Sequence, residues 1–242
     1  MRISFCLLLV FIFTLTYSKE KTDSSSAKLK VNGNVSLNSN GFAPIPSFSL
    51  DKPALIAALT LQRKRFSFDP QIAYGLNMRP WLIDNWLHYR LILKPRFELR
   101  IGLDFSMFFS EYDTGETKIL QGQKYLTFEV ASIYKFSPKS SITLMCWSDN
   151  GQDPGSIKGY FYNILYDRTD IEIGESILFS GSLQLFCISY TGNNDGLFIS
   201  PRIAASVRNV PLSLFFQATQ SLTTDIEPDP GFRWNVGVAY LF

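Results

Sequence analysis

The charged side chains of this chain alternate with apolar ones, and this spacing restricts the chemistry that they can do. In the segment 96–109, Glu98, Arg100 and Asp104 occupy one row of an alternating pattern. Asp84, His88 and Arg90 form a similar row in the segment 81–93. Such rows can line a water-filled pore and select ions or solutes, or pair with one another and fill an interior. The residues that we assign to this inward row are Asp84, His88, Arg90, Glu98, Arg100, Asp104, Glu129, Arg202, Arg208 and Arg233.

His88 is the single histidine of the chain and therefore the first candidate for a general base. Asp84 is four residues away along an extended strand, roughly 13 Å at about 3.3 Å per residue, so it cannot orient the ring. The sequence contains no cluster of metal-ligand residues. We therefore expect no catalytic residues, no metal and no cofactor.

The elements that carry these rows are strands, because large apolar residues recur with a period of two. The segment 96–109 is the clearest example, with one uninterrupted apolar row: Phe97, Leu99, Ile101, Leu103, Phe105, Met107 and Phe109. The pattern predicts an all-β chain of twelve strands: 28–37, 54–62, 66–77, 81–93, 96–109, 123–136, 140–150, 157–169, 177–190, 196–208, 211–220 and 231–242. Most are close to the 9–11 residues that a tilted strand needs to cross a bilayer.

The lengths of the connections support an antiparallel, up-and-down β-barrel that spans a membrane. Connections after even-numbered strands are mostly short, whereas those after odd-numbered strands include the longer segments 38–53, 110–122, 151–156 and 221–230. This parity is typical of barrels with both chain ends on the periplasmic side. Pro70 and Pro201 fall inside predicted strands, where each removes a ladder hydrogen bond. We expect local irregularities there.

The start of the chain has the pattern of a cleaved secretory signal peptide at residues 1–18. Arg2 precedes a short apolar core, and small residues precede the expected cleavage site. Residues 19–27 are predicted to be a flexible periplasmic lead-in, and residues 28–242 the barrel. A formal net charge of +2 gives no basic patch, so we expect no nucleic-acid partner.

The last nine residues, from Trp234 to Phe242, form a strand with a large apolar row and a smaller row. This ending resembles the C-terminal signal of bacterial outer-membrane β-barrels, through Asn235, Gly237, Tyr240 and Phe242. The resemblance implies a Gram-negative outer-membrane location, contact with outer-membrane lipid, and recognition of this strand by the barrel-assembly machinery. Composition and turns resemble those of barrels from Bacteroidetes-type bacteria, and the oligomeric state stays open.

Three functions remain on these observations. The first is a narrow, porin-like channel for ions or small solutes, with the inward charges as its filter. The second is a non-conducting structural or adhesive barrel that acts through its outer loops. The third, which the position of His88 disfavours, is a lipid-modifying enzyme.

Overall fold

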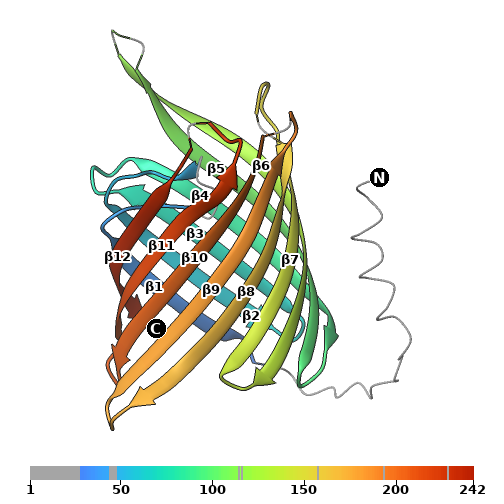
Figure 1. Cartoon of the computed structure of the whole chain (residues 1–242), viewed down its shortest axis with the longest axis vertical. Helices are drawn as coiled ribbons and strands as arrows, with labels where there is room; N and C mark the ends of the chain where they lie inside the picture. The colour runs from blue at the N-terminus through green and yellow to red at the C-terminus, as the bar shows by residue number, and fades with distance from the viewer. Residues whose placement is uncertain are drawn as a thin grey trace.

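The protein is a closed, antiparallel barrel of twelve strands, as predicted (Figure 1). The computed structural model describes residues 28–43, 48–113, 115, 117–156, 158–192, 194–227 and 229–242. The predicted signal peptide and lead-in lie outside these residues. The strands are β1 (Lys30–Asn38), β2 (Ala54–Arg63), β3 (Phe66–Gly75), β4 (Pro80–Leu93), β5 (Phe97–Asp113), β6 (Lys118–Ser137), β7 (Ser140–Gly151), β8 (Lys158–Ile173), β9 (Ile177–Tyr190), β10 (Asn194–Val207), β11 (Leu212–Thr224) and β12 (Phe232–Leu241).

The two ends of the barrel differ in the connections that they carry. The connections after odd-numbered strands gather at one end, which we call the loop end, and the short connections after even-numbered strands gather at the other, the turn end (Figure 1). The C-terminus lies toward the turn end. The predicted parity of short and long connections therefore corresponds to a real separation in space.

The alternation of each strand separates an apolar outer surface from the lumen. In β8, Tyr160, Tyr162 and Ile164 point outward and are 38% to 48% exposed, whereas Phe161 and Asn163 point inward and are 1% and 5% exposed. The register carries the same division around the barrel, since residues on one face pair with residues on the same face of the next strand. Large apolar side chains are exposed on the outer face of strand after strand, as expected for a surface that meets lipid.

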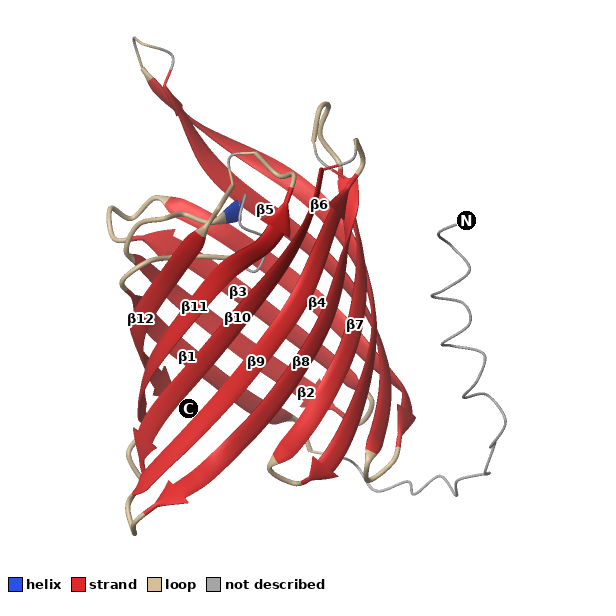
Figure 2. Ribbon diagram, in the orientation of Figure 1, coloured by secondary structure: helices blue, strands red, loops and turns tan. Residues whose placement is uncertain are grey.

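The predicted loop 110–122 is wrong, because most of it forms strand. β5 and β6 remain paired as far as Asp113 and Lys118, and the hairpin projects beyond the barrel at the loop end (Figure 2). Beyond Phe108, β5 pairs only with β6, so the projecting part is a two-stranded ribbon. Within the described residues, no helix is long and apolar enough to span a membrane.

Pro201 interrupts a ladder, as expected, and a side chain makes up for the missing donor. The β10–β11 pairing lacks residue pairs between Ile199↔Gln220 and Arg202↔Gln217, which places Pro201 opposite Ala218. The Ser200 hydroxyl donates to the Ala218 carbonyl oxygen at 2.7 Å. This bond satisfies a buried carbonyl beside a residue that has no N–H.

The barrel closes where β12 meets β1. Phe242 and Gly33 exchange two backbone hydrogen bonds of 2.8 and 3.0 Å. The Phe242 ring lies against Gly33, where an added Cβ would come within 2.6 Å of the ring atom Cζ. The absence of a side chain at Gly33 therefore lets the last residue of the chain complete the seam.

Candidate functional site

The centre of the lumen contains a network of charges around His88. Its Nδ1 lies 2.7 Å from Asp69 Oδ2 on β3, and its Nε2 lies 3.5 Å from Glu129 Oε1 on β6. Glu129 is 2% exposed and also accepts hydrogen bonds from Arg100 Nε at 2.8 Å and from Trp147 Nε1 at 2.9 Å. His88 is thus held between two carboxylates, and the Ser67 hydroxyl on β3 donates to the same Asp69 Oδ2 at 2.8 Å. Asp84, the neighbour considered from the sequence, does not orient the ring.

A second pair joins two inward residues across the β4–β5 turn. Arg90 Nε donates to Glu98 Oε1 at 2.8 Å, and the Glu98 side chain is 8% exposed. Both Arg90–Glu98 and Arg100–Glu129 link a cation to a nearly buried carboxylate. These charges therefore hold neighbouring strands together.

The inward acids of the loop-end half of the lumen are bound differently. Asp104 Oδ1 accepts a hydrogen bond from the Asn85 backbone N–H at 2.8 Å, where the β4–β5 ladder lacks its regular pairs. Asp149 accepts one from the Thr127 hydroxyl at 2.7 Å. Asp84 belongs to the same face, opposite Gln71. In the described part of the chain, no group of three or more His, Cys, Asp or Glu residues is arranged to hold a metal ion.

Two residues of the predicted inward row lie at the rims of the barrel. Arg208 follows the last residue of β10 and pairs with Glu172 at 3.4 Å, with about half of each side chain exposed. Its backbone N–H still donates to the Ser176 carbonyl oxygen at 2.8 Å, and its place in the lumen row stays a prediction. Arg233 is the second residue of β12, at the loop end, and pairs at 3.0 Å with Asp51 of the β1–β2 connection. Arg202 does face the lumen, where its guanidinium lies over the Phe215 ring at 4.8 Å.

A series of aromatic ring contacts runs along the inner face of the barrel from β4 to β10. Its successive centroid distances are 5.3 Å for Trp86–Trp147, 4.6 Å for Trp147–Phe161, 5.3 Å for Phe161–Phe186 and 5.1 Å for Phe186–Phe198. The largest side chains with less than 2% exposure all belong to lumen-facing positions: Tyr125, Phe161, Phe186, Ile188 and Phe198. Of these rings, Tyr125, Phe161, Phe186 and Phe198 are packed against other atoms, whereas Trp86 and Trp147 are only partly buried.

Two connections at the loop end contribute side chains to this packing. Phe48, from the β1–β2 connection, stacks on Phe108 at a centroid distance of 4.0 Å and meets Tyr125 edge-on. Ile226, from the β11–β12 connection, is 8% exposed and joins the cluster of Phe161 and Phe198. Neither contact could be predicted from the sequence, since an apolar residue in a loop belongs to no periodic pattern.

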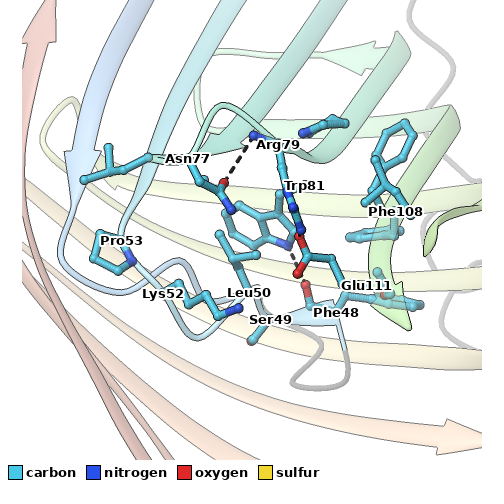
Figure 3. A pocket seen from close by; sticks show the side chains of 16 residues that line it. Phe48, Ser49, Leu50, Lys52, Pro53, Asn77, Arg79, Trp81, Phe108 and Glu111 are labelled. Carbon is cyan, nitrogen blue, oxygen red and sulfur yellow. Dashed lines mark hydrogen bonds and ion pairs between the residues drawn. The ribbon is translucent and has the colours of Figure 1, made fainter. Parts of the chain in front are cut away.

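A pocket of about 450 Å³ opens at the loop end, between the β1–β2 connection, the β3–β4 connection and the base of the projecting hairpin (Figure 3). Its floor contains Trp81 and Phe108, and its rim contains Lys52, Arg79 and Glu111. Trp81 points inward because of a register shift in the β3–β4 pairing. None of these residues belongs to the predicted inward row, so sequence reasoning missed this pocket.

The residues of the predicted assembly signal have clear partners in the folded barrel. Asn235 points inward and binds Asn38 Oδ1 at 2.9 Å and the Asn40 backbone N–H at 3.1 Å. Gly237 lies under the Phe215 ring. Tyr240 and Phe242 are 50% and 57% exposed on the outer surface. The four positions thus serve the closing seam of the barrel.

Solved structures with a similar fold are bacterial outer-membrane β-barrels. The KdgM porin has a TM-score of 0.57 and 10% identity, covering 87% of this chain and 99% of its own. An outer-membrane channel from Pseudomonas putida F1 has a TM-score of 0.54 and 12% identity, covering 92% of this chain and 100% of its own. LpxR from Salmonella typhimurium has a TM-score of 0.52 and 11% identity, covering 87% of this chain and 100% of its own.

The TM-scores show a shared fold. At identities this low, no activity carries over to this chain. No protein-family model matches the sequence, and a search of curated proteins finds no match.

Proposed function

We propose that this chain, which has the fold of bacterial outer-membrane β-barrels, is an occluded barrel of the outer membrane that acts through its loop end. In this proposal the loop end faces the outside of the cell, because short turns face the periplasm in such barrels. One observation carries the proposal: Tyr125, Phe161, Phe186 and Phe198 face the lumen and are at most 1% exposed. Lumen side chains of an open channel would be in contact with water.

The charges of the lumen support the same proposal. Arg100–Glu129, Arg90–Glu98 and His88–Asp69 are direct contacts of 2.7 to 2.8 Å between nearby strands. A paired cation offers little attraction to a passing anion, because its charge is already compensated at close range. The network therefore fills and stiffens the interior.

The turn-end half of the lumen favours a second candidate, a narrow channel that opens when the loop-end contacts move. Arg202 faces the lumen and is nevertheless exposed, so water reaches this part of the interior. Under this alternative, replacement of Arg202 by alanine changes the ion selectivity of the open state.

Solute flux into vesicles tests the proposed function. Vesicles that contain the refolded barrel are transferred to isosmotic solutions of small sugars, and swelling is recorded by light scattering. We expect the same rate as for protein-free vesicles, while an open porin in the same lipid provides the positive control. Swelling that depends on solute size would show a permanently open lumen and overturn the proposal.

A further inference from the structure

The pocket at the loop end has an apolar floor within a lining that also includes Ser49, Asn77 and Ser110. Trp81 is only 3% exposed and its Nε1 donates to the Phe48 carbonyl oxygen at 2.8 Å, so the indole closes the bottom of the pocket and offers no free donor. Phe108 is stacked on Phe48, and Leu50 completes this side of the pocket. The volume of about 450 Å³ lies within the usual range for small-molecule sites. The floor therefore suits an apolar body.

Of the charged side chains at the rim of the pocket, Lys52 has no ion-pair partner among the described residues. Arg79 is paired with Glu111, and Asp51, next to Lys52, is paired with Arg233 at 3.0 Å. Lys52 is exposed, and in the described part of the chain no carboxylate lies within 4.0 Å of its ammonium group. Figure 3 shows Lys52, Arg79 and Glu111 around the Trp81 ring. The uncompensated charge of the rim is positive.

The backbone on both sides of the pocket is fixed before any ligand arrives. The Lys52 carbonyl oxygen accepts a hydrogen bond from Gly41 N–H at 2.8 Å, and Leu50 N–H donates to the Gly41 carbonyl oxygen at the same distance. Across the pocket, the Arg79 backbone N–H donates to Asn77 Oδ1 at 3.2 Å. A site held in this way loses little entropy when it binds a ligand.

We propose that this pocket binds a small amphipathic anion, with an apolar or aromatic body against Phe108 and Leu50 of the floor and a carboxylate beside Lys52. The inference rests on the proposed function, for which it names the ligand class of the loop end. An anion is favoured over a cation because the free rim charge is positive.

The test is a calorimetric titration of the full-length barrel in lipid nanodiscs with 2-naphthoate. 2-Naphthol serves as the neutral probe of the same shape. In the Lys52→Met variant, which keeps the length of the side chain, we expect naphthoate affinity to fall by about tenfold or more, as for the loss of a charge-assisted bond. Naphthol binding should not change. Lys158→Met, at the loop-end start of β8, removes a lysine outside the pocket and should not affect either probe.

Three outcomes separate this inference from the proposed function. Saturable naphthoate binding that depends on Lys52 supports the inference. Absent binding, or equal naphthoate affinity in the wild type and the Lys52→Met variant, overturns it, provided that both proteins show the gel mobility of a folded barrel. Solute flux through the wild type together with Lys52-dependent binding would overturn only the occluded state and leave the ligand site standing.

Discussion

Glu129 shows how a single buried carboxylate organises the lumen. Its partners come from three other strands: Arg100 on β5, His88 on β4 and Trp147 on β7. The alternation of the sequence was sufficient to place Arg100 and Glu129 on inward faces. It did not reveal their contact, because Arg100 pairs in the backbone ladder with Ala131, and Glu129 lies diagonally across. Such a contact requires a register, which a periodic pattern leaves undetermined.

We expect the Arg100→Met substitution to lower the free energy of unfolding by about 3 kcal/mol, because it leaves the buried Glu129 carboxylate without its closest cation. The measurement is equilibrium urea unfolding in phospholipid vesicles. Arg208→Met is the matched control. It breaks a half-exposed pair with Glu172 at the turn end and should cost at most about 1 kcal/mol. Equal losses in the two variants would show that the lumen pair does not stabilise the barrel.

The last strand shows what a sequence motif means in the folded element. Gly237 was recognised as part of an ending that resembles an assembly signal. In the barrel its position is also a steric requirement, because a Cβ there would lie 2.3 Å from Phe215 Cζ. Phe215 in turn lies beneath the Arg202 guanidinium. Gly237 is therefore both part of the sequence motif and required by the packing of Phe215.

We expect Gly237→Ala to destabilise the folded barrel by about 1–3 kcal/mol, as overpacking does elsewhere. The readout is the urea concentration at the unfolding midpoint in vesicles. The double variant Gly237→Ala, Phe215→Ala should recover part of the loss, because the clash is removed. Gly181→Ala on β9 is the control, since its nearest neighbour is a backbone oxygen at an ordinary 3.8 Å. If the double variant recovers nothing, the Phe215 contact is not the cause.

Truncation of the same strand tests its role in assembly. Removal of Phe242 deletes both backbone hydrogen bonds to Gly33 at the β1–β12 seam. We expect a smaller fraction of heat-modifiable, folded barrel in outer membranes. Leu241→Ala, which leaves the final ring and both bonds in place, serves as the comparison. Normal insertion of the truncated chain would show that Phe242 is not needed for barrel assembly.

The architecture of the whole molecule could be predicted wherever the sequence has a regular period. A period of two fixes which side chains face outward, and the parity of the connections indicated a closed, up-and-down barrel. The extension of β5 and β6 beyond the rim was missed because Ser110 and Glu111 have the composition of a loop, while the pairing of the two strands decides their structure. The packing of Phe48 into the loop end was missed for a related reason. Only the assembled barrel brings Phe108 and Tyr125 within its reach.

The occluded interior is a property of the assembled barrel, and single-channel recording tests it most directly. The wild-type protein is inserted into a planar lipid bilayer under a salt gradient, beside a variant in which Phe48 and Ile226 are both alanine. Our account predicts that the wild type inserts without current steps and that the double variant shows openings. Discrete steps of the wild type, proportional to salt concentration and equal in size to those of the variant, would show that the lumen is open and contradict the account.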